Sequence, residues 1–175
     1  MVTGRILCNE VNQTLFTGII GCDAADLNNG SAVNQSTSSR GLSGMATSHD
    51  GSFVLIADFT ANKIRKLIVS SGVMTVFAGS SNVGGGNGVG AYAQFDGPTD
   101  VFISEDGSWA MSVCQRGHRI RHMVISDATV TTIAGDGVVG SSDGIGTFAR
   151  FSAPSSLRPL SDSKFVLIAD RDNHQ

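Results

Sequence analysis

The chain has little of several features that would assign it to a class directly. Its 175 residues include only three Pro, three Cys, one Trp and one Tyr, and charged residues make up 15%. No apolar run reaches the roughly 18 residues of a membrane-spanning helix, so no membrane span is expected. A net charge of −3 gives no overall attraction for nucleic acid or for an anionic membrane.

The residue types that are abundant in the chain favour strands joined by turns. There are 22 Gly residues, many Val, Ile, Thr and Ser, and 41% of the chain is hydrophobic. Such a chain is globular, and these residue types prefer strands and tight reversals over helices. We predict an all-β fold.

One motif occurs twice. Residues 86–95 read GNGVGAYAQF, and residues 142–151, which lie 56 positions later, read SDGIGTFARF. Other landmarks keep this offset, among them Asp50-Gly51 with Asp106-Gly107, Phe95 with Phe151, and Pro98 with Pro154. The segment FVLIAD at 53–58 returns at 165–170, which is twice the offset. The chain is therefore a repeat protein with a period of 56 residues.

Each repeat predicts four short strands, which in the clearest copy are 100–104, 108–114, 119–125 and 129–134. Four up-and-down strands form one sheet that cannot cover both of its faces alone, and radial stacking of such sheets produces a β-propeller. A repetitive β-sandwich is the alternative. In the propeller, the motif that occurs twice would link neighbouring blades, with its Phe anchoring the crossover.

The first forty residues follow the repeat with an offset of 58, since Arg5-Ile6 aligns with Lys63-Ile64 and Thr17 with Thr75. The chain then divides into about three blades' worth of one propeller domain, which we expect to belong to a larger, six-bladed type. Residues 1–40 are the second half of a blade plus a degenerate crossover loop, 41–96 and 97–152 are blades, and 153–175 are the first half of another.

These motifs resemble the NHL repeat. The resemblance is carried by GVGAYAQF at 88–95, Gly117-His118-Arg119-Ile120, and IADRDNHQ at 168–175, which is similar to the family's "VAD-x-x-NH-x-I" turn. It implies an NHL-type propeller and no single activity. Cys114 departs from the pattern, because the other copies carry Asp there. The predicted structural anchors are Asp58, Phe95, Pro98, His118, Phe151, Pro154, Asp170 and His174.

The sequence predicts no catalytic, cofactor or metal site. His118 and His174 are repeat-equivalent turn residues, and His49 and His122 lack partners at a metal-binding spacing. Asp58 and Asp170 are interpreted as turn caps rather than a catalytic pair. Basic residues at 63, 65 and 66 and their counterparts at 119, 121 and 122 predict a band on successive third strands, interpreted as a solvated face and alternatively as an RNA contact.

Three sequons, beginning at Asn12, Asn29 and Asn34, predict N-linked glycans on exposed turns and an extracellular or cell-surface location. A disulfide between Cys8 and Cys22 would require an irregular loop, because the expected hairpin places these residues out of register. Cys114 has no evident partner.

The expected function is a non-enzymatic scaffold that binds protein or glycan partners. The alternatives are a propeller-type lyase or hydrolase with a metal in the central channel, and an RNA-binding regulator. The chain begins and ends at the same point of the repeat. We therefore expect either a longer polypeptide that supplies further blades, favoured because the start lacks a signal-peptide pattern, or copies that join head to tail.

Overall fold

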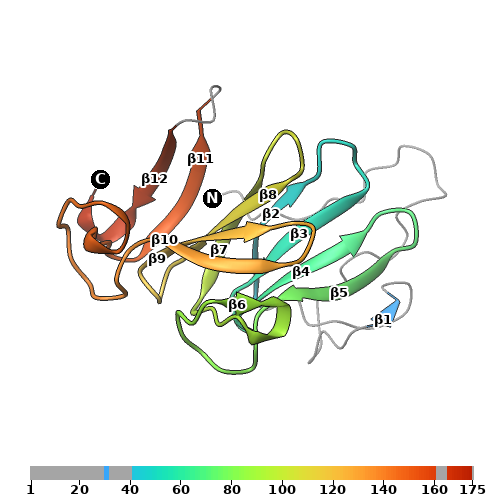
Figure 1. The fold of residues 1–175 in the computed structure, drawn as a ribbon, viewed down its shortest axis with the longest axis horizontal. Helices are drawn as coiled ribbons and strands as arrows, with labels where there is room; N and C mark the ends of the chain where they lie inside the picture. Colours follow the sequence, from blue (N-terminus) through green and yellow to red (C-terminus); the bar gives the residue numbers. More distant parts are fainter. Residues whose placement is uncertain (1–29, 32–40, 161–164, 175) are drawn as a thin grey trace.

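The computed structural model describes residues 30–31, 41–160 and 165–174, and it is all-β, which confirms the predicted class. The strands form three antiparallel sheets that lie side by side in chain order (Figure 1). Sheet 1 contains β1 (Gly30–Ser31), β2 (Leu42–Thr47), β3 (Phe53–Asp58), β4 (Lys63–Ile68) and β5 (Val73–Ala78). Sheet 2 contains β6 (Gly88–Val89), β7 (Pro98–Ile103), β8 (Trp109–Cys114), β9 (Arg119–Val124) and β10 (Thr129–Ala134). Sheet 3 contains β11 (Pro154–Pro159) and β12 (Val166–Asp170).

The described helices are the single 3₁₀ turns η1 (Gly90–Tyr92), η2 (Gly146–Phe148) and η3 (Arg171–Asn173). None of these is long enough to cross a membrane. The strands β2 to β5 and β7 to β10 follow the same up-and-down order and are offset by 56 residues. The four strands predicted for the clearest copy lie within two residues of those observed.

The turns explain why the strands end where they do. Gly51 and Gly107, each with φ +70°, close the turns between the first and second strands of their sheets. Asn62, His118 and His174 occupy the left-handed region at φ 56°, 49° and 57°. These three residues are 56 positions apart and follow the second strand of each sheet. The same reversal of the backbone is therefore built three times.

The crossover linker joins the outer edge of one sheet to the first strand of the next. Within it, β6 adds to β10, and the N–H of Gly90 donates to the carbonyl of Ala128 (2.9 Å). In the same way β1 adds to β5. Gly30 lies opposite Met74 in sheet 1, and Gly88 lies opposite Val130 in sheet 2. The strand residues 74 and 130 are 56 positions apart, whereas the linker residues 30 and 88 are 58 positions apart. The longer first linker predicted from the sequence is thus observed at β1.

The core lies between the sheets. Leu55 and Ile64 of sheet 1 pack with Ala110, Met123 and Val130 of sheet 2 in one buried cluster. The opposite face of sheet 2 packs on sheet 3, where Val113, Ile120 and Leu157 form a second cluster. Sheet 2 therefore buries apolar side chains on both faces, as the stacking argument requires.

Phe95 and Phe151 differ in burial although they occupy the same repeat position. Phe95 is fully buried in the cluster between sheets 1 and 2, whereas Phe151 is half-buried beside the two-stranded sheet 3. Each ends its crossover linker with a parallel bridge, to Val83 and Val139 respectively. The recurring Phe therefore packs at the junction of two sheets, and how completely it is buried depends on the extent of the second sheet.

Replacing Phe95 with Ala should lower the free energy of unfolding by about 3–5 kcal/mol, because a fully buried aromatic side chain leaves a cavity. Phe151→Ala should cost less, since that ring is half-buried. Phe148→Ala is the matched control, because its ring is 82% exposed. Urea denaturation measures all three, and equal costs for Phe95 and Phe148 would contradict a packing role.

Candidate functional site

A pocket of about 280 Å³ opens between two hairpin turns of neighbouring sheets. Ser48, His49, Asp50 and Phe53 line it from the β2–β3 turn, and the β7–β8 turn contributes Glu105, Asp106 and Gly107. The two sides are repeat-equivalent, because 48–51 and 104–107 differ by 56 residues. Sheet stacking thus brings together two copies of one turn to frame a single concave site.

The turn carboxylates are held in place by serine hydroxyls. The Ser104 hydroxyl donates to Asp106 Oδ1 (2.7 Å), and the N–H of Ser108 donates to the same oxygen (3.0 Å). These bonds stabilise the ionised carboxyl and lower the pKa of Asp106 to about 2. Hydrogen bonds from Ser48 and then Ser52 lower the pKa of Asp50 to about 2 as well. Both carboxyls are therefore charged at neutral pH.

The remaining walls add an aromatic ring and two exposed ionisable groups. Phe53 is half-buried, and the Lys66 ammonium lies 4.2 Å from the centre of its ring. His49 and Glu105 are exposed. The pocket thus places two ionised carboxylates beside a ring that already contacts the Lys66 ammonium, and it is the carboxylates that favour a small cationic group.

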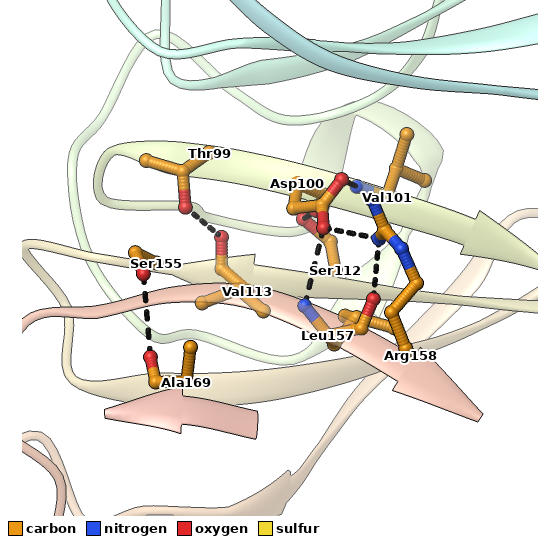
Figure 2. A network of polar contacts seen from close by, with 9 residues as sticks. All are labelled: Thr99, Asp100, Val101, Ser112, Val113, Ser155, Leu157, Arg158 and Ala169. Carbon is orange, nitrogen blue, oxygen red and sulfur yellow. Dashed lines mark hydrogen bonds and ion pairs between the residues drawn. The ribbon is translucent and has the colours of Figure 1, made fainter. Parts of the chain in front are cut away.

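A second polar cluster ties together the first strands of the sheets (Figure 2). Asp100 on β7 is buried, and its Oδ2 accepts from the N–H of Leu157 (3.1 Å) and from Arg158 Nη1 (2.7 Å) on β11. Its backbone carbonyl accepts from the Ser112 hydroxyl (2.9 Å). Asp100 therefore links β7 to β11, while the Arg158 side chain stays 69% exposed.

The first strands of sheets 1 and 2 approach more closely still. A Cβ atom at Gly44, the repeat counterpart of Asp100, would lie 2.6 Å from the Asp100 Cα. Beside it, the Ser43 hydroxyl donates to the carbonyl of Pro98 (3.1 Å). Sequence comparison between repeats missed this cluster, because the positions equivalent to Asp100 hold Gly44 and Ser156. The one available signal was an isolated carboxylate within the apolar strand 98–103.

Asp58 and Asp170, the predicted turn caps, are both buried and both accept hydrogen bonds at turns. Asp58 accepts from the N–H of Ala61 (2.9 Å) and pairs with Arg65 Nε (2.7 Å). Asp170 accepts from the N–H of Ser152 (2.7 Å) and from Asn173 Nδ2 (2.5 Å). The structure does not bring these two carboxylates together.

Cys114 occupies the equivalent position in sheet 2 and changes the local electrostatics. Its thiol is buried, and burial raises its pKa to about 11, so it is neutral. Arg121, the counterpart of Arg65, is fully buried, and its Nε has no hydrogen-bond partner. Burial lowers the pKa of Arg121.

Arg121 binds the crossover linker instead of a carboxylate. It donates to the carbonyls of Gln94 (2.5 Å) and Gly86 (3.0 Å) and lies over the Phe95 ring. Interpreting residues 65 and 121 as part of an exposed basic band was therefore wrong. Both side chains are buried, Arg65 beside Asp58 and Arg121 against the crossover linker, so they form no exposed surface for RNA to contact.

The predicted turn histidine, His118, forms a hydrogen bond that links sheet 2 to sheet 3. Its Nδ1 accepts from the N–H of Ala153 (3.0 Å), just before β11 begins. Asn62 does the same one repeat earlier, because its Oδ1 accepts from the N–H of Gly97 (2.9 Å) just before β7. His174 has the same backbone conformation and is exposed.

Pro98 and Pro154 are buried and begin β7 and β11. Asn12, Asn29, Asn34, Cys8 and Cys22 lie outside the described residues. In the part of the chain that the structure describes, no group of three or more His, Cys, Asp or Glu side chains is arranged to hold a metal ion.

Replacing His118 with Asn should leave stability within about 0.5 kcal/mol of the wild type, because Asn62 shows that an amide oxygen accepts the same bond and Asn tolerates the left-handed region. His118→Ala should cost about 1–3 kcal/mol, since it leaves the N–H of Ala153 without its acceptor. Thermal denaturation of both variants tests this. A His118→Asn variant as unstable as His118→Ala would contradict the fastening role.

Ser104→Ala should raise the pKa of Asp106 from about 2 towards its ordinary value, as followed by the NMR shift of the carboxyl carbon during an acid titration. Because the folded-state pKa is lowered, the contribution of Asp106 to stability is present above about pH 4 and is lost as the pH falls through about 2. Asp50 is the internal control and should keep its low pKa. An unchanged Asp106 in the variant would rule out the serine as the cause.

Comparisons with known proteins place the fold. No family model matches the chain. It is 27% identical over 166 residues to Protein SUPPRESSOR OF QUENCHING 1, chloroplastic, of Arabidopsis thaliana, covering 90% of this chain and 16% of that protein. The chain thus spans about a sixth of that relative's length.

Solved structures that share the fold include two auxiliary nutrient binding proteins. The protein from Bacteroides ovatus has a TM-score of 0.66 at 24% identity, over 74% of this chain and 35% of that one. The protein from Bacteroides thetaiotaomicron has a TM-score of 0.65 at 20% identity, with the same coverage. The chain therefore has a β-propeller-like fold built of stacked antiparallel sheets.

Proposed function

We propose that this chain is part of an NHL-type β-propeller that acts as a non-enzymatic binding scaffold. The NHL type is supported by the left-handed residues at 62, 118 and 174, by the 56-residue period from residue 41 onward and by the repeated crossover linker. The names of the two Bacteroides neighbours, both described as nutrient binding proteins, agree with a binding role.

The observation that carries the proposal is the pocket between the two hairpin turns. Its walls belong to separate sheets that are held together by a buried core, so the turns are displayed on a rigid support. Asp50 and Asp106 keep their charge at neutral pH, and the Phe53 ring supplies an apolar surface. We infer that the pocket accepts a Lys or Arg side chain of a protein partner.

Exposed apolar side chains on the linkers offer a second contact surface, separate from the pocket. Tyr92 is 86% exposed and Phe148, its repeat counterpart, is 82% exposed. Exposed aromatic side chains are enriched at protein interfaces. An extracellular location and N-linked glycans remain predictions, and the plant relative is named as a chloroplastic protein.

Titration with N-acetyl-arginine amide and N-acetyl-lysine amide, followed by amide NMR shifts, tests the pocket. Residues 48–53 and 104–108 should shift, because the cationic head would contact both turns. N-acetyl-glutamine amide is the neutral control probe and should leave these signals unchanged.

Glu105→Ala should weaken that binding about three- to tenfold, because it removes one exposed carboxylate from the pocket wall. Asp143→Ala is the matched control, since Asp143 is exposed on a linker outside the pocket. Absence of shifts at both turns, or equal weakening by the two variants, would contradict the proposed ligand.

A further inference from the structure

The junction between sheets 2 and 3 differs in its chemistry from the junction between sheets 1 and 2. Where sheet 1 meets sheet 2, Asn62 Oδ1 accepts from the N–H of Gly97 (2.9 Å). Where sheet 2 meets sheet 3, His118 Nδ1 accepts from the N–H of Ala153 (3.0 Å). An amide oxygen accepts at any ordinary pH, whereas an imidazole nitrogen accepts only while it carries no proton. The junction of sheets 2 and 3 therefore depends on the protonation state of one side chain.

This hydrogen bond also fixes the tautomer of His118. Because Nδ1 accepts, the neutral ring carries its proton on Nε2. A proton added to Nδ1 would face the N–H of Ala153, and two donors cannot form a hydrogen bond with each other. Histidine is the side chain whose charge ordinarily changes between about pH 5 and 8. Acidification in that range would remove the His118 bond and leave the Asn62 bond intact.

The residue that His118 binds has a more strained backbone than its counterpart one repeat earlier. Ala153 has φ +52° and Gly97 has φ +61°, so both lie in the left-handed region. Glycine adopts this region freely, but the Cβ atom of alanine crowds the backbone there. The bond to His118 therefore helps to hold Ala153 in this conformation just before β11 begins. Loss of the bond would favour a change of the backbone at that point.

The elements around His118 carry several charged or titratable side chains. Its hairpin lies against both linkers, since the N–H of Gly117 donates to the carbonyl of Asp96 (3.0 Å) and a Cβ atom at Gly135 would meet the His118 carbonyl. The side chains are Cys114, Arg116 and Arg119 on the hairpin, Asp96, Asp136 and Arg150 on the linkers, and Arg171, Asp172 and His174 at η3. Arg116 and Arg150 pair with linker carboxylates, and Arg119 donates to two carbonyls.

Asp172 supplies a second partner for a protonated His118. The charges of these two side chains interact. A hydrogen bond from Arg171 is the main cause that holds the pKa of Asp172 below its ordinary value, so this carboxylate stays charged wherever histidine titrates. The N–H of Asp172 donates to the carbonyl of Ser152 (3.0 Å), which places η3 beside Ala153. A cationic His118 would be attracted to the Asp172 carboxylate.

We propose that His118 is a pH-sensitive hydrogen-bond switch between sheets 2 and 3. Neutral His118 binds the N–H of Ala153 and holds the start of β11 against sheet 2. Cationic His118 releases this N–H and turns towards Asp172, which loosens the junction at acidic pH. The junction held by Asn62 has no such release. The switch is independent of the proposed binding function, because no residue of the acidic pocket takes part in it.

Nitrogen NMR of the imidazole and amide hydrogen exchange of the 175-residue chain test the switch. At about pH 7.5 the His118 Nδ1 signal should be that of an unprotonated nitrogen, because this atom accepts a hydrogen bond. Between about pH 7.5 and 5 the protection factor of the Ala153 amide should fall at least about fivefold, since its acceptor is lost. The Gly97 amide is the internal control, and its protection factor should stay constant because Asn62 does not titrate.

His118→Asn should keep the Ala153 amide equally protected at both pH values, because an amide oxygen accepts the bond throughout. His174→Asn is the matched control variant, since His174 has the same left-handed backbone and is exposed. This variant should keep the wild-type fall in protection. A proton on Nδ1 in the neutral ring, unchanged protection of Ala153 in acid, a parallel fall at Gly97, or an equal fall in His118→Asn would overturn the proposal.

Discussion

The structure depends on one constraint, which is that each sheet is apolar on both faces. Sheet 2 buries Ala110, Met123 and Val130 against sheet 1, and Val113 and Ile120 against sheet 3. A sheet of this kind is stable only between two neighbours, because each uncovered face exposes hydrophobic area to water. The stacking order of the sheets follows from this requirement.

Apolar faces alone would allow the sheets to slide, and a small set of hydrogen bonds fixes their positions. Asn62 and His118 bind the backbone just before the next first strand, at 2.9 and 3.0 Å. Asp100 joins β7 to β11 nearer the middle of the strands. Because several of these groups are buried and paired, they specify a geometry that hydrophobic contact leaves undefined.

The repeats carry different residues at a few equivalent positions. Cys114 replaces the aspartate of the other sheets, and Arg121 consequently binds linker carbonyls instead of a carboxylate. Asp100 stands where the other two sheets have Gly44 and Ser156. It forms an ion pair between sheets 2 and 3 with Arg158, whereas Gly44 has no side chain that could form the equivalent pair between sheets 1 and 2. The pocket, in contrast, is built from two copies of one repeated turn, with His49 in one copy where Glu105 stands in the other.

The sequence by itself determined the 56-residue period, the four strands of a sheet and the turns between them, because strand alternation and Asp-Gly turn chemistry act over a few neighbouring residues. Tertiary structure decided the burial of Arg65 and Arg121, which looked like surface charges. It also paired Asp100 with Arg158, 58 residues away, and brought the turns at 48–53 and 104–107 around one pocket. These outcomes depend on how far a side chain reaches across two stacked sheets, and no local pattern in the chain encodes that distance.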